Sequence, residues 1–501
     1  MPDAGIVLAT FDLLAYLVIC HVIGTAILLA VRLNIRGLVP PSALIGCAAL
    51  AIQLWAFGFA HIPWNVFTLL LPWVAVWVVL RRPLRQTLQA QIKSAWAALA
   101  RLRGVEPLSG ALIAIAALLI VVYGLNAFLH PAAGWDAIAF WYFKAKVFFI
   151  EQHVDPASPA FASIPRLVVV RNQEYPPLYP LMLASTFVVS GRVNEVLSNS
   201  INLLALIAVV PTMYSQVRRL VGSRLGIVFV FLLVAMAIPA ASRFLIDGGY
   251  FGHADYVEAI WILLTLIYLQ AGESGDGAAN VMAVACAVGA ALTKDEGTPL
   301  LFVTLAVLIV RQAWRWRRWQ ERPAPRNLAI AAVCVLPVVI WHLTWSLSGK
   351  ITPLMLNHHP LSLLPQLPSR AATIARYVAG IPFNRTLNAL STRVATGIGW
   401  NTYVWMALAL PMSLLLLAYN RFRSGAAVSV VFGLQLLAYF VVYLFTPIDL
   451  TEHLSESVDR VILQLAPSVI LLLAVTISPY RSTTWRDAAG MRDADRREPA
   501  A

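Results

Sequence analysis

The chain has 501 residues, of which 60% are hydrophobic and only 12% are charged. This composition excludes an ordinary soluble domain and is typical of a protein that crosses a membrane many times. A formal net charge of +13 would favour nucleic-acid binding in a soluble protein, but here the basic residues gather in short loops between apolar stretches, as the positive-inside rule predicts. We therefore expect membrane lipids, and no nucleic acid, as partners.

The first four apolar stretches orient the chain. They cover residues 5–31, 42–60, 62–80 and 109–129. Each is close to the roughly 20 residues that a membrane-spanning helix needs. Residues 81–104 place basic and apolar side chains on opposite faces of a helix, which predicts a helix on the cytoplasmic membrane surface. The fourth stretch then runs outward and delivers Asp136 to the periplasmic side.

The later basic stretches are all expected in the cytoplasm. They are residues 218–224, 311–326, 421–423 and the arginine-rich tail after 479. This arrangement requires that residues 177–190, too few for a comfortable span, form a re-entrant or interfacial helix. The sequence then predicts an all-α polytopic membrane protein with about 13 spans. Residues 247–256, 350–397 and 446–460 would lie outside, although five basic residues within 350–397 count against that placement.

A charged segment, TKDEG at residues 293–297, separates two short apolar stretches, residues 280–292 and 298–310. Three charges at this depth are costly unless they face a water-filled cavity lined by protein. We therefore expect a cavity that reaches below the outer membrane surface and contains this segment.

Four outward-facing clusters hold polar residues that burial in a membrane would not select. They are GWDAIAFWYFKAK at 134–146, NQEYPPLYP at 172–180, DGGYFGHAD at 247–255 and HLSESVDR at 453–460. Each has an ordinary structural explanation: a helix cap at Asp136, a rigid junction at the prolines, a glycine turn before a capped helix, and a salt-bridged helix start. Together with Lys294, however, the clusters bring carboxylates and cations to one side, which suits anion binding with base catalysis.

The order of four motifs resembles that of a known enzyme family. The motifs are GWDA…W…KAK, YPPLYP, ALTKDEG and YLFTPIDLTEHLSESVDR…QLAP, within residues 109–467. In this respect the chain is similar to bacterial membrane glycosyltransferases of the GT-C fold, in the branch of the protein mannosyltransferases and the aminoarabinose and galacturonic acid lipid A transferases. The resemblance implies a GT-C-type bundle of transmembrane helices in the bacterial inner membrane, with its active site facing the periplasm.

The resemblance also implies a reaction. A sugar would move with inversion from a polyprenyl-phosphate donor to a lipid or glycan acceptor, which fits a chain without a glycine-rich nucleotide loop. Asp136 would be the general base for the acceptor hydroxyl, and Lys294 and Arg460 would bind the donor phosphate. The other candidates would position the sugar or the acceptor: Glu174, Tyr175, Asp255, Glu296 and His453.

The residues do not indicate a cofactor. His358 and His359 are adjacent in a loop and have no carboxylate at metal-ligand spacing, so they predict no metal site; a divalent metal is left open. Two other functions suit the same fold class. A transporter or flippase for a lipid-linked sugar would have inverted repeats or matched broken helices, which we do not find in the sequence. An O-antigen ligase or polymerase would keep the enzyme class and change the donor to a diphosphate-linked glycan.

We expect four parts along the chain. They are a three-helix N-terminal extension with the surface helix at 1–107, a GT-C catalytic core with the first periplasmic loop at 108–311, C-terminal transmembrane helices with periplasmic loops at 312–480, and a disordered cytoplasmic tail at 481–501.

Overall fold

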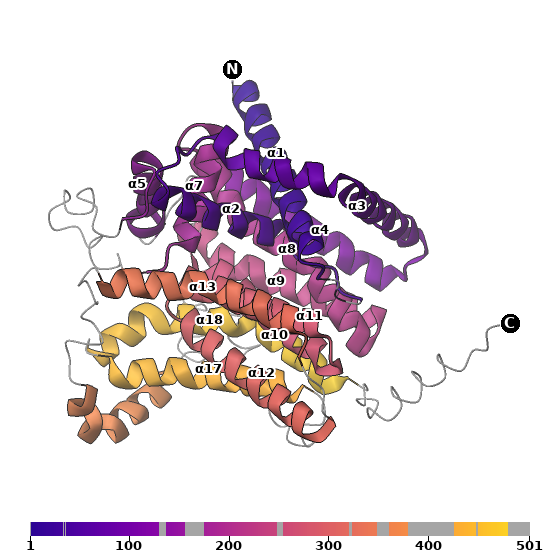
Figure 1. Ribbon diagram of the computed structural model, residues 1–501. Helices are drawn as coiled ribbons and strands as arrows, with labels where there is room; N and C mark the ends of the chain where they lie inside the picture. The colour runs from indigo at the N-terminus through magenta and orange to yellow at the C-terminus, as the bar shows by residue number, and fades with distance from the viewer. Residues whose placement is uncertain are drawn as a thin grey trace.

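The computed structural model shows a bundle of helices (Figure 1). It describes residues 2–33, 35, 37–129, 137–155, 175–247, 254–319, 323–347, 360–378, 425–446 and 449–478. Within these ranges every regular element is a helix. This confirms the predicted all-α fold, because a helix satisfies the polar groups of its own backbone and so tolerates lipid.

The elements follow one another in chain order. The first are α1 (Pro2–Ala30), α2 (Ser42–Phe59), α3 (Val66–Arg101), η1 (Leu102–Gly104), α4 (Pro107–Leu129), η2 (Ala137–Tyr142), α5 (Phe143–Glu151), α7 (Leu178–Ser190), α8 (Glu195–Val221) and α9 (Ser223–Asp247). The others are α10 (Ala254–Ala271), η4 (Gly272–Ser274), α11 (Gly277–Thr293), α12 (Gly297–Trp319), α13 (Pro325–Leu347), η5 (Pro360–Gln366), α17 (Ala426–Phe445) and α18 (Leu450–Ile477).

In the part of the chain that the structure describes, nine helices are long and apolar enough to cross a membrane. Shorter apolar helices accompany them, at Leu178–Ser190, Ser223–Ala235, Gly277–Thr293 and Gln464–Ile477. The chain is therefore a multi-pass membrane protein, as its composition predicted. The count of about 13 spans stays a prediction.

Whether helix α7 crosses the membrane decides on which side every later loop is predicted to lie. It has 13 residues, about 20 Å of helix, and is too short for a hydrocarbon core of about 30 Å. The next helix, α8, begins beside α5, where Glu195 forms an ion pair with Lys146 at 2.7 Å. It then continues for 27 residues to a basic last turn. A short α7 followed by a full-length α8 supports the interpretation that α7 is re-entrant or interfacial.

One predicted boundary in the N-terminal part is wrong. The expected span at 62–80 and the expected surface helix at 81–104 form a single helix, α3, with 36 residues and a length of about 54 Å. Pro83 lies inside this helix without ending it. Residues 84–101 contain no glycine or proline, so their helix propensity continues the helix beyond the apolar stretch, and a hydrogen bond of 3.0 Å between His21 and Gln91 joins this part of α3 to α1.

A second predicted boundary, the end of a short stretch at residue 310, is also wrong. Helix α12 continues to Trp319, because residues 311–318 are mostly arginine, glutamine, alanine and tryptophan and contain no glycine or proline. The neighbouring helix supplies partners there, since Arg315 Nη2 donates to the backbone oxygen of Glu273 at 2.7 Å.

Helix α10 has the largest buried share among these candidate spans. It packs against α8, α11, α17 and α18, and Figure 1 shows α10, α11, α17 and α18 side by side. The chain turns sharply between α11 and α12 beside the start of α10. A Cβ on Gly297 would lie 2.2 Å from the backbone carbon of Ala290, so glycine allows α12 to begin this close to α11.

Candidate functional site

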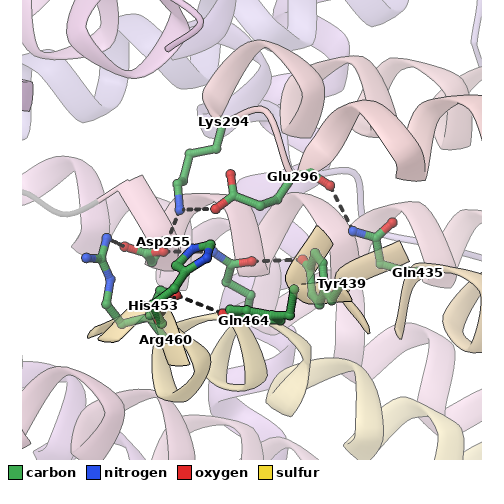
Figure 2. Close-up of polar contacts among 10 residues, drawn as sticks. Asp255, Lys294, Glu296, Gln435, Tyr439, His453, Arg460 and Gln464 are labelled. Carbon is green, nitrogen blue, oxygen red and sulfur yellow. Dashed lines mark hydrogen bonds and ion pairs between the residues drawn. The ribbon is translucent and has the colours of Figure 1, made fainter. Parts of the chain in front are cut away.

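Opposite charges meet where α10 begins and α11 ends. Lys294 lies between α11 and α12, with its Nζ 2.9 Å from Oδ1 of Asp255 and 2.7 Å from Oε1 of Glu296. Asp255 belongs to the first turn of α10. Figure 2 shows the three side chains pointing toward one another. Two of the three charges of the TKDEG segment, Lys294 and Glu296, are therefore partnered by protein groups.

Two side chains of α18 reach the same aspartate. Arg460 Nη2 lies 2.8 Å from Oδ2 of Asp255, and Gln464 Nε2 donates to Oδ1 of Asp255 at 2.7 Å. A spacing of four residues places Arg460 and Gln464 on one face of the helix. The Asp255 carboxylate thus accepts hydrogen bonds from three side chains that come from two separate elements (Figure 2).

Helix α17 supports this network from the side. The hydroxyl of Tyr439 donates to Oε1 of Gln464 at 2.8 Å, and Nε2 of Gln435 donates to the backbone oxygen of Glu296 at 2.8 Å. These bonds orient the amide of Gln464 and the start of α12.

Lys294 keeps its charge although its side chain is only 3% exposed. Burial by itself lowers the pKa of Lys294, but Asp255, Glu296 and Glu258 raise it, and the outcome is a pKa well above the usual lysine range. Nearby opposite charges that outweigh desolvation have this effect. Lys294 is therefore an ammonium ion at neutral pH.

Two aromatic side chains lie next to the ion pairs. The ring centroid of Tyr175 lies 5.9 Å from Nζ of Lys294 and 5.7 Å from Nζ of Lys144. Trp141 stacks on Tyr175 with their ring centroids 5.4 Å apart. Burial raises the pKa of Tyr175, so its phenol is neutral and can donate a hydrogen bond.

The structure brings most of the predicted site residues into one place. Those that meet are Tyr175, Asp255, Lys294, Glu296 and Arg460. His453 lies two helical turns before Arg460 on α18, where its Nδ1 is 2.8 Å from Oγ1 of Thr446. Asp136 and Glu174 lie outside the described residues, as do His358 and His359.

Sequence reasoning missed four polar residues of this region. Gln435, Tyr439 and Gln464 are neutral and occur in apolar stretches; the signals for Gln464 were its spacing of four from Arg460 and its place at the start of QLAP in the fourth motif. Glu258 lies one turn after Asp255 and is fully buried, and its carboxyl oxygens have no hydrogen-bond partner among the described residues. A carboxyl group within an apolar span is itself a signal of function.

Across the described ranges, no three histidine, cysteine, aspartate or glutamate side chains are grouped so that they could hold a metal ion. The donors of the site are instead an ammonium, a guanidinium and an amide. Such groups bind anionic oxygen atoms.

The fold and the site define a helical, multi-pass membrane protein with a buried ion-pair network at one end of its bundle. No protein-family model matches the chain, and no curated protein matches it. Among solved structures, it is similar to the crystal structure of ArnT from Cupriavidus metallidurans bound to undecaprenyl phosphate, with 15% sequence identity and a TM-score of 0.41. The similarity covers 77% of this chain and 63% of the ArnT chain, so this chain spans less than two thirds of that protein's length.

Proposed function

We propose that this protein is an inverting glycosyltransferase of the GT-C type. It would move a sugar from a polyprenyl phosphate to a lipid or glycan acceptor at the periplasmic face of the bacterial inner membrane. The observation that carries the proposal is the convergence of two cations, Lys294 and Arg460, on one oxyanion at the end of the bundle. The order of the four motifs supports the same function.

The proposed reaction is a single displacement. The oxygen of the acceptor hydroxyl attacks the anomeric carbon, and its proton passes to the carboxylate of Asp136. The bond between the anomeric carbon and the phosphate oxygen breaks, and its electron pair leaves with the polyprenyl phosphate. Lys294 and Arg460 stabilise the charge that develops on this leaving group, which is worth most where water is excluded.

The other predicted residues are proposed to position the reactants. Tyr175 presents its neutral hydroxyl next to Lys294, and Glu296 holds the lysine ammonium in place. Glu174 and His453 are proposed to contact the sugar or the acceptor. We place the catalytic core in residues 108–311, with Arg460 contributed by the C-terminal helices.

Transfer of radiolabel from a defined set of polyprenyl-phosphate sugars to total membrane acceptors tests the proposal. Purified wild type should transfer label from one donor, and Asp136→Asn should lose transfer because it lacks the base while it still binds donor. Asp155→Asn is a matched control, since it makes the same change at the next aspartate along the chain.

Full transfer by Asp136→Asn would show that Asp136 is not the general base. Binding of a lipid-linked sugar without transfer by the wild type would favour a flippase. Transfer only from a diphosphate-linked glycan would favour a ligase or polymerase.

A further inference from the structure

The three donors of the site are already occupied by a protein carboxylate. Nζ of Lys294 and Nε2 of Gln464 bond to Oδ1 of Asp255, and Nη2 of Arg460 bonds to Oδ2. A phosphate bound to the same donors would compete directly with this carboxylate, because both groups present oxygen atoms that accept charge-assisted hydrogen bonds.

We propose that the Asp255 carboxylate occupies the position of the donor phosphate, that the phosphate displaces it on binding, and that Gln464 is then a third donor to the phosphate. This inference rests on the proposed function, and it adds a phosphate-binding residue and an internal competitor to it.

The balance of charge within the ion pairs favours the exchange. They join two cations, Lys294 and Arg460, to two carboxylates, Asp255 and Glu296, and Lys144 and Glu258 add one nearby charge of each sign. A phosphate added to this balanced set would bring an uncompensated negative charge into a region where Lys294 is 3% exposed. Such a charge is costly in a poorly hydrated site. Withdrawal of one carboxylate restores the balance.

Asp255 is the carboxylate that can withdraw. It comes from α10, whereas the donors come from α18 and from the junction between α11 and α12, so it can turn away without moving them. It also lies in the first turn of α10, where the helix dipole stabilises a negative charge.

Two of the donors keep an anchor of their own when Asp255 leaves. Tyr439 orients the amide of Gln464, and Glu296 holds Nζ of Lys294 at 2.7 Å. The donor set is therefore organised before the phosphate binds, which lowers the entropic cost of binding.

Farnesyl phosphate is the probe ligand for this inference, and farnesol, which lacks the phosphate, is the control ligand. In detergent-solubilised full-length protein, Asp255→Asn should bind farnesyl phosphate about tenfold more tightly than wild type. The neutral side chain no longer competes with the phosphate for a charge-assisted hydrogen bond. Farnesol affinity should not change. Asp276→Asn is the matched control. Asp276 caps the start of α11, at the end of the helix that is far from Lys294. Asparagine caps a helix equally well, so the affinity of this variant for farnesyl phosphate should equal that of wild type.

Gln464→Met provides an independent test if Asp255→Asn does not fold. It should weaken binding of farnesyl phosphate severalfold, because the bond that Gln464 donates to a doubly charged phosphate is stronger than the bond to the singly charged carboxylate that it replaces, and it should leave farnesol affinity as it is. Weaker or equal binding by a folded Asp255→Asn, or unchanged binding by Gln464→Met, would overturn the inference. Either result would leave the proposed function standing if the wild type transfers sugar. Absence of both farnesyl phosphate binding and sugar transfer in the wild type would overturn both.

Discussion

At the scale of single residues, the ammonium of Lys294 makes two ion pairs, and its loss should destabilise the protein. Lys294→Met leaves Asp255 and Glu296 without their common partner, which costs about 3 kcal/mol of unfolding free energy. Folding raises the pKa of Lys294, so its contribution is complete below the usual lysine pKa of about 10.4 and is lost as the pH rises through the raised value. Unfolding in mixed micelles between pH 7 and 11, followed by circular dichroism, measures both effects.

The double variant Lys294→Met with Glu296→Gln is the control for this prediction. It removes one of the two carboxylates that the single variant leaves unpaired, so part of the lost stability should return. A single variant as stable as wild type, with the same pH profile, would show that the ion pairs contribute nothing to folding.

Glu258 should behave differently from Lys294. It is fully buried, and neither of its carboxyl oxygens has a hydrogen-bond partner in the described part of the protein. Glu258→Gln keeps the shape of the side chain and removes the group that is costly to bury as an anion, so stability should be unchanged or higher. The melting temperature in detergent measures this. A clearly lower melting temperature would mean that the attraction between this carboxylate and Lys294 exceeds the cost of burying it.

At the scale of elements, α1 and α2 touch through their backbones. A Cβ on Gly46 would lie 1.8 Å from the backbone oxygen of Cys20, and one on Gly24 would lie 1.9 Å from that of Ser42. Small residues of this kind allow close helix packing in lipid, where no hydrophobic force drives helices together. We infer that these two positions set the distance between α1 and α2.

Gly46→Ala should therefore force α1 and α2 apart. The expected loss is about 2 kcal/mol of unfolding free energy, as for other overpacked interfaces. Gly433→Ala makes the same change in α17, where, beyond the helix's own nearby backbone, no heavy atom of the described residues lies within 4 Å of the added Cβ, and should be neutral or slightly stabilising. Thermal unfolding of the two variants in the same detergent compares them directly. Equal stability of both variants would contradict the close contact.

At the scale of the whole molecule, the site and the arginine-rich end of α12 lie at opposite ends of α10. Helix α10 has 18 residues, about 27 Å of helix, and joins Asp255 at the site to the end where Arg311 bonds to the backbone oxygen of Leu269. The separation is close to the thickness of a hydrocarbon core. In the proposed orientation this basic end lies in the cytoplasm and the site faces the periplasm.

This orientation predicts which introduced cysteines react in intact cells. Glu452→Cys lies at the exposed start of α18, and Ser274→Cys lies at the exposed end of η4, which follows the far end of α10. A membrane-impermeant maleimide should label the first in intact cells and the second only after the membrane is permeabilised. The unaltered protein is the control, since Cys20, Cys47 and Cys286 are buried and Cys334 is only partly exposed. The reverse labelling pattern would place the site in the cytoplasm.

The lengths of the helices could be predicted only in part. The bounds of α2 and α4 follow from their apolar stretches, because apolar length decides what crosses lipid. The unbroken course of α3 and the far end of α12 could not be predicted in this way. There, polar residues without glycine or proline continue the helix past the apolar residues, and they bond to α1 and to η4.

The sequence by itself determined the membrane class, the all-α fold and the charged candidates Asp255, Lys294 and Arg460, because an apolar solvent makes spans and buried charges conspicuous in a single chain. Only the tertiary structure decided that these three share one network with Gln464 and Tyr439. The residues are separated by up to 209 positions, and it is the packing of α10, α11, α17 and α18 that brings their side chains within hydrogen-bonding distance.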